Sequence, residues 1–203
     1  MPKESSQVVD KIIKFAKRSG VIRIRDLIAH GIHPEYARRL CNQGLLIRSG
    51  RGLYIPSDLD LTENHTLAEA CKRVPGAVGC LLTALRFHEI GTQLPRQIWM
   101  AIARKATLPK VDYPPLRFVR FSGQALKEGI EIKEIEGVEV KVYNPPKTVA
   151  DCFKYRNKIG LDVALEALRE CWRGRRCTMD QLWHYSKICR VSNVMRPYLE
   201  SLT

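Results

Sequence analysis

The sequence predicts an α+β fold, in which helices occupy both ends of the chain and strands occupy its centre. Near the two ends, apolar residues recur every three or four positions, as on one buried face of a helix. In the predicted strands between residues 116 and 143 they instead alternate with charged residues. The 203 residues, 45% of them hydrophobic, are enough to bury a core without disulfides or metals. This composition excludes a disordered chain.

Two further features bear on the location of the protein. No stretch contains the roughly 18 uninterrupted apolar residues that a membrane span requires, and no apolar segment follows the first lysine as in a secretory signal. The seven cysteines are an odd number and include no CxxC pair, which is typical of reduced and buried thiols. We therefore expect a soluble, cytoplasmic protein with no membrane partner, no metal site and no cofactor.

Residues 1–58 are predicted to form three helices followed by a hairpin. The first helix carries its apolar face along residues 8–16. A second helix covers residues 25–30, and a third begins at Pro34 and ends before Gly44. Two β-prone runs then surround a Ser-Gly-Arg turn in residues 45–55. This order of elements is that of a winged helix-turn-helix.

The third helix and the hairpin carry the side chains that suit contact with DNA. At 100° per residue, arginines and an asparagine fall on the side of the helix opposite its apolar residues. Arginine can read guanine, asparagine can read adenine, and basic residues on a wing can contact phosphates. The net charge of +6 in residues 1–58 favours the same partner. The candidate DNA-binding residues are Tyr36, Arg38, Arg39, Asn42, Arg48 and Arg51.

Residues 59–203 are predicted to form a second, α+β domain, a small mixed or antiparallel sheet packed by helices. A strongly apolar helix is expected over residues 78–90. The predicted strands cover residues 98–103, 116–121, 130–135 and 138–143, and the last two form a hairpin with one apolar and one charged face. Helices are expected over residues 148–155 and 161–172, then after Thr178 and Ser192.

A catalytic alternative comes from the charged hairpin. Glu131 and Lys133, like Glu139 and Lys141, form a Glu-x-Lys pattern downstream of Asp112, which loosely matches the metal-binding motif of some nucleases. However, strands with one solvated face produce Glu-x-Lys readily. No histidine pair, P-loop or dinucleotide motif is present. We therefore do not expect an enzyme, and a metal-dependent nuclease is kept as the alternative.

Four segments of the chain form a recognisable combination. Residues 25–54 carry the pattern of the winged helix, which many regulators share. More distinctive are residues 84–95, which end in Gly-Thr-Gln-Leu-Pro, and residues 147–158, which read Lys-Thr-Val-Ala-Asp-Cys-Phe-Lys-Tyr-Arg-Asn-Lys. Together with residues 160–170, these segments resemble the AbiEi-type antitoxins of bacterial type IV toxin–antitoxin systems, and the resemblance covers nearly the whole chain.

The resemblance implies two functions. The N-terminal domain is expected to bind inverted repeats in double-stranded operator DNA and repress its own operon. The domain of residues 59–203 is expected to counteract a co-encoded nucleotidyltransferase toxin, with or without direct contact. Its candidate partner surface consists of Lys147, Lys154, Arg156 and Lys158. Lys154, Arg156 and Lys158 could face the toxin or form a basic surface that follows DNA, and a charged, solvated helix explains them equally well. A protein-interaction module with a scaffold winged helix is the second alternative.

Overall fold

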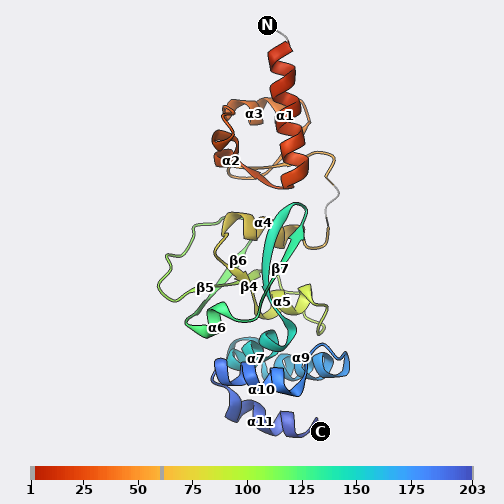
Figure 1. The fold of residues 1–203 in the computed structure, drawn as a ribbon, viewed down its shortest axis with the longest axis vertical. Coiled ribbons are helices and arrows are strands. Elements are labelled where there is room, and N and C mark those ends of the chain that lie inside the picture. Colours follow the sequence, from red (N-terminus) through yellow and green to blue (C-terminus); the bar gives the residue numbers. More distant parts are fainter. Residues whose placement is uncertain (1–2, 60–61, 203) are drawn as a thin grey trace. The chain divides into compact units, whose positions relative to one another are not determined.

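The structure is a computed structural model and describes residues 3–59 and 62–202. The chain divides into two compact units (Figure 1). The N-terminal unit comprises the chain up to Lys72 together with Glu134–Glu139, and the C-terminal unit comprises the rest. None of the described helices is long and apolar enough to cross a membrane.

The N-terminal unit contains the predicted helices and hairpin. Its elements are α1 (Lys3–Ser19), β1 (Ile22–Arg23), α2 (Ile24–Ala29), α3 (Glu35–Asn42), β2 (Leu46–Gly50) and β3 (Leu53–Pro56). The three strands form an antiparallel sheet in the order β1-β3-β2. Its core consists of apolar residues from all three helices and the hairpin, among them the fully buried Ile12, Leu27, Leu40 and Leu46. The predicted winged helix-turn-helix is therefore confirmed.

A segment distant in the sequence completes the N-terminal unit. Residues Glu134–Glu139, the tip of a later hairpin, cluster with it. The Glu136 carboxylate accepts hydrogen bonds from the backbone amide and the hydroxyl of Thr62, at 2.7 and 2.8 Å, and lies 2.6 Å from Nδ1 of His65. A Cβ on Gly20 would lie 1.5 Å from the Glu136 carbonyl oxygen, so only glycine fits there.

The elements that follow build a sheet with helices around it. They are α4 (His65–Arg73), β4 (Val78–Gly79), α5 (Leu81–Phe87), β5 (Ile98–Ala103), β6 (Leu116–Phe121), α6 (Gln124–Lys127), β7 (Ile130–Ile135), β8 (Val138–Tyr143), α7 (Pro145–Lys154), α8 (Arg156–Ile159), α9 (Leu161–Arg173), α10 (Met179–Ile188) and α11 (Ser192–Glu200). The strand order is β6-β5-β4-β8-β7. β5 runs parallel to β6 and antiparallel to β4, so the sheet is mixed.

Two details differ from the sequence prediction. The helix expected over residues 78–90 begins only at Leu81, because Val78 and Gly79 form the central strand β4 and pair with Ala101 and Met100. A short apolar run fits a buried strand as well as a helix, so periodicity could not separate them. The apolar face of the hairpin is also incomplete, because Ile132 on the edge strand β7 is 59% exposed.

The core of the C-terminal unit is organised around α7. This helix is buried along most of its length and packs against α5, α9 and α10, while α11 packs against α10 (Figure 1). Phe153 on α7, Ala167 on α9 and Leu182 on α10 are fully buried. Asn144 caps α7 by accepting the backbone amide of Lys147, and a capping box at Thr178 begins α10 as predicted.

Candidate nucleic-acid interface

The helix α3 has one buried and one exposed face. Ala37 and Leu40 are buried in the core of the N-terminal unit, and Tyr36 is half-buried at the margin. Arg38, Arg39 and Asn42 are exposed. The structure thus places these side chains on the outward face that the helical spacing predicts.

The turn between α2 and α3 is held by local contacts. Gly31 adopts a φ of +70°, and Ile32 beyond it is buried. The backbone amide of Glu35 donates to Nδ1 of His33 at 3.2 Å, which satisfies one of the free amides at the start of α3. The ring of His30 lies 4.4 Å from that of Phe15 on α1. These contacts fix the direction in which α3 leaves the turn.

The hairpin of β2 and β3 forms the wing. Its register shifts between Arg48 and Gly50, and Gly52 adopts a φ of +71° in the turn. Arg48 and Arg51 are both exposed, and Nε of Arg48 donates to the Gly50 carbonyl at 3.3 Å. The wing therefore carries two guanidinium groups on the surface of the N-terminal unit.

The exposed face of α3 includes one acidic residue, Glu35, and the arginines of this surface outnumber it. Within residues 3–59 and 62–202, no ion pair involves Arg38, Arg39, Arg48 or Arg51. The Arg39 guanidinium lies 5.6 Å from the centre of the Tyr36 ring, a cation–π contact that leaves its hydrogen-bond donors available. Unpaired, exposed guanidinium groups are well suited to phosphate and to base edges.

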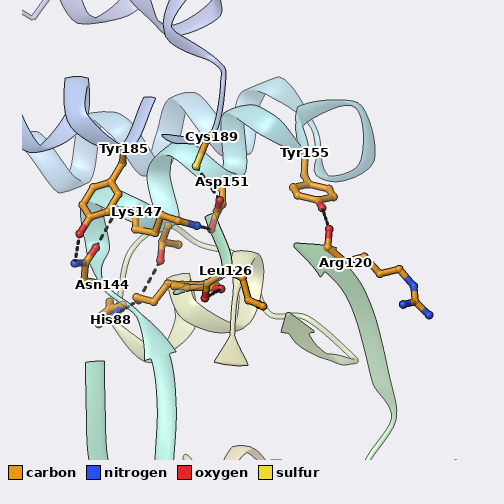
Figure 2. A network of polar contacts seen from close by, with 11 residues as sticks. His88, Arg120, Leu126, Asn144, Lys147, Asp151, Tyr155, Tyr185 and Cys189 are labelled. Atoms are coloured by element: carbon orange, nitrogen blue, oxygen red, sulfur yellow. Dashed lines mark hydrogen bonds and ion pairs between the residues drawn. The ribbon is translucent and has the colours of Figure 1, made fainter. Parts of the chain in front are cut away.

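The prediction that Lys147 lies on a partner surface is wrong. Lys147 is fully buried, and its Nζ lies 2.6 Å from Oδ2 of Asp151 one helical turn further along α7 (Figure 2). The same Nζ lies 4.1 Å from the centre of the Tyr143 ring and 4.8 Å from that of Phe121. A charged side chain can be buried when a partner charge and aromatic faces replace water. Lysine followed four residues later by aspartate, amid apolar residues, was the signal available in the sequence.

This buried ion pair belongs to a network that ties together β8, α7 and α10. Asp151 accepts a hydrogen bond from the Cys189 thiol at 3.2 Å, and Nδ2 of Asn144 donates to the Tyr185 hydroxyl at 3.0 Å (Figure 2). Burial raises the pKa of Asp151, while the Lys147 charge opposes that rise. The distinctive segment of residues 147–158 is thus, in its first half, a structural element of the core.

The other predicted partner residues lie at the surface of the C-terminal unit. Lys154 and Lys158 are exposed, and Arg156 is half-buried, with a guanidinium nitrogen donating to the Phe153 carbonyl at 3.0 Å. Nζ of Lys158 lies 5.6 Å from the centre of the Tyr155 ring. The structure brings these three residues together at the end of α7 and in α8.

The residues behind the nuclease alternative do not converge on a metal site. Across the part of the chain that the structure describes, no three histidine, cysteine, aspartate or glutamate side chains cluster so that they could hold a metal ion. Lys133 and Glu139 are exposed on the two strands of the β7–β8 hairpin, and Asp112 is exposed in the loop before β6. The geometry therefore gives the nuclease alternative no support.

Residues 10–56 match a family model whose description is "Transcriptional regulator, AbiEi antitoxin". The matched segment includes the helix-turn-helix and the wing, and over these residues it confirms the resemblance found in the sequence. No curated protein matches the chain significantly.

A solved structure shares the fold beyond the AbiEi segment. The crystal structure of the RV2827C protein from Mycobacterium tuberculosis superposes with a TM-score of 0.61 and 15% sequence identity. The match covers 91% of this chain and 71% of that chain. Both the winged helix and the C-terminal α+β unit therefore have a counterpart of known structure.

Proposed function

We propose that this chain is a DNA-binding transcriptional repressor of the AbiEi type. The observation that carries the proposal is the outward face of α3, where Arg38, Arg39 and Asn42 are exposed directly opposite the buried Ala37 and Leu40. The match of residues 10–56 to the AbiEi regulators supports the same role. The DNA-binding domain is proposed to correspond to residues 1–58 and the antitoxin domain to residues 59–203.

In this proposal α3 enters the major groove of the operator. Arginine can make paired hydrogen bonds to guanine and asparagine to adenine, so Arg38, Arg39 and Asn42 supply base contacts. Arg48 and Arg51 on the wing contact phosphates or the minor groove. An operator of inverted repeats would bring two copies of the winged helix to neighbouring half-sites.

We further propose that the chain acts as an antitoxin against a co-encoded nucleotidyltransferase toxin. The family description supports an antitoxin, and the specific toxin follows from the sequence resemblance. The proposed partner surface consists of Lys154, Arg156 and Lys158, without the buried Lys147. In this role the chain acts by regulation and neutralisation and is not an enzyme.

The helix assignment is tested by removing the two outward arginines. A fluorescent duplex from the promoter of the chain's own operon is titrated with the wild type and with the Arg38→Ala, Arg39→Ala variant. Because removing a side chain that reads a base costs about 1–3 kcal/mol, the variant is expected to bind more weakly by at least tenfold. Unchanged affinity in a variant that retains its circular dichroism spectrum would contradict the assignment.

A matched control removes the same charge elsewhere in the N-terminal unit. Lys11 and Lys14 are exposed on α1, outside the helix-turn-helix and the wing. The Lys11→Ala, Lys14→Ala variant is expected to weaken binding less than threefold. Equal losses in the two variants would show that only total charge matters.

The alternative of a protein-interaction module has one observation in its favour. Three large apolar side chains of the N-terminal unit are exposed, Ile28 at 57%, Leu45 at 41% and Ile47 at 50%. Salt dependence separates the two functions, because several phosphate contacts require a steep loss of affinity as salt rises. An interaction module would show no binding to the promoter duplex that depends steeply on salt.

A further inference from the structure

The C-terminal unit contains a basic pocket of which the proposed function uses only Lys154. The pocket has a volume of about 730 Å³ and lies where the end of β6, the start of α6, and the C-terminal ends of α7 and α10 meet. Its wall is rich in cationic residues drawn from distant parts of the chain. They are Arg104, Arg120, Lys154, Lys187 and Arg190.

The charge of this pocket is almost uncompensated. Of the residues that line it in the described part of the chain, Asp151 alone is acidic, and its charge is already paired with the buried Lys147 at 2.6 Å. Arg104, Lys154, Lys187 and Arg190 are exposed and form no ion pair within residues 3–59 and 62–202. A concave site lined by one sign of charge concentrates ligands of the opposite sign.

One of the cations is fixed in place by the backbone. A guanidinium nitrogen of Arg120 donates to the carbonyls of Arg104 at 2.5 Å and Ala106 at 2.9 Å. These carbonyls hold the side chain without cancelling its full positive charge. The Tyr155 hydroxyl donates to the Arg120 carbonyl at 3.3 Å, which ties α7 to the end of β6 (Figure 2). Hydrogen bonds within the protein therefore hold this part of the wall.

The remaining lining residues offer neutral contacts. Ser122 and Gln124 carry a hydroxyl and an amide, and the half-buried ring of Tyr155 packs 5.6 Å from the ring of Phe121. Hydroxyl and amide groups can bond to a sugar or a base, and an aromatic ring provides an apolar surface for a base. The pocket thus combines a cationic part with a smaller polar and aromatic part.

We propose that this pocket binds a nucleoside polyphosphate. Five exposed cations line one pocket, which exceeds what a single carboxylate or monophosphate needs, and they match a chain of phosphates. The volume lies within the range of about 300–1,000 Å³ of small-molecule sites. A free nucleotide can enter a concave site, whereas a duplex presents its phosphates on a convex surface. The antitoxin domain would then carry a ligand site of its own, separate from the residues proposed to contact the operator.

The test is a titration of the full chain with the fluorescent nucleotides MANT-ATP and MANT-GTP. The variant Lys154→Ala, Lys187→Ala removes two exposed pocket cations, and the control Arg169→Ala, Arg173→Ala removes two exposed cations from α9 outside the pocket. We expect saturable binding of at least one nucleotide, at least tenfold weaker in the pocket variant and changed less than twofold in the control. Circular dichroism establishes that both variants are folded.

Three results would overturn the proposal. The first is no saturable binding of either nucleotide at millimolar concentration. The second is an equal loss in the pocket variant and the control, which would indicate attraction to overall charge. The third is displacement of the probe by duplex DNA at matched phosphate concentration, together with a loss of DNA affinity confined to the pocket variant. That result would make the pocket a nucleic-acid contact, whereas displacement by inorganic tripolyphosphate and not by duplex supports the proposal.

Discussion

At the scale of single residues, burial decides whether a charge serves the fold or the surface. Lys147 and Lys154 lie on the same helix, yet Lys147 is fully buried against Asp151 and Lys154 is exposed. The sequence marks both simply as lysines of one amphipathic segment. Their difference depends on the rings of Phe121 and Tyr143, which reach Lys147 from β6 and β8 and could not be located from sequence.

The buried pair yields a prediction about stability. Asp151→Asn leaves the Lys147 charge buried without a partner, which is expected to lower the free energy of unfolding by about 3–5 kcal/mol. Urea unfolding followed by tryptophan fluorescence measures this, because Trp99, Trp172 and Trp183 all lie in the C-terminal unit. The double variant Lys147→Met, Asp151→Leu removes both charges and is expected to recover most of the loss. A single variant as stable as the wild type would contradict the buried pairing.

His88 is expected to make the stability of the protein depend on pH. Burial lowers the pKa of this imidazole, although its Nε2 donates to the Tyr143 carbonyl at 2.8 Å. A histidine whose pKa is lower in the folded state binds protons more readily when unfolded, so stability falls as the pH drops below its ordinary pKa of about 6.5. The free energy of unfolding is therefore expected to decrease between pH 7 and pH 5. His88→Gln should flatten this dependence, and an unchanged slope would exclude His88 as its source.

Among the secondary-structure elements, prediction from the sequence succeeds best for helices and strands that have one buried face and one solvent-exposed face. This holds for α3, for the wing and for β8, whose valines are buried while Glu139 is exposed. It fails at β4, a two-residue strand in the middle of the sheet, because its continuous apolar run carries no period. The edge strand β7 also departs from the pattern, since its Ile132 is 59% exposed.

A variant of the wing distinguishes contacts with phosphates from contacts with bases. Arg48→Ala, Arg51→Ala is expected to weaken binding to specific and unrelated duplexes alike. The slope of log affinity against log salt should become shallower by about one for each phosphate that the variant no longer neutralises. Fluorescence anisotropy over a range of salt concentrations measures both effects. A loss restricted to the promoter sequence would instead mean that the wing reads bases.

In the molecule as a whole, the two units differ in how well their functional residues can be predicted from the sequence. The candidate DNA-binding residues lie within residues 36–51, close enough along the chain for helical spacing and turn chemistry to reveal them. The basic pocket is assembled from residues between Arg104 and Arg190, and only the folded C-terminal unit brings them together. The tip of the β7–β8 hairpin likewise joins the N-terminal unit through Glu136, an interaction that no local pattern indicates.

The proposed function depends on contact between duplex DNA and the outward face of α3 together with the wing. Amide hydrogen exchange of the full chain, with and without a saturating promoter duplex, measures this contact. We expect slower exchange in α3 and in the β2–β3 turn on binding, with the exposed turns of α1 around Lys11 and Lys14 unchanged. Bound duplex with no protection in α3 or the wing would rule out this mode of binding.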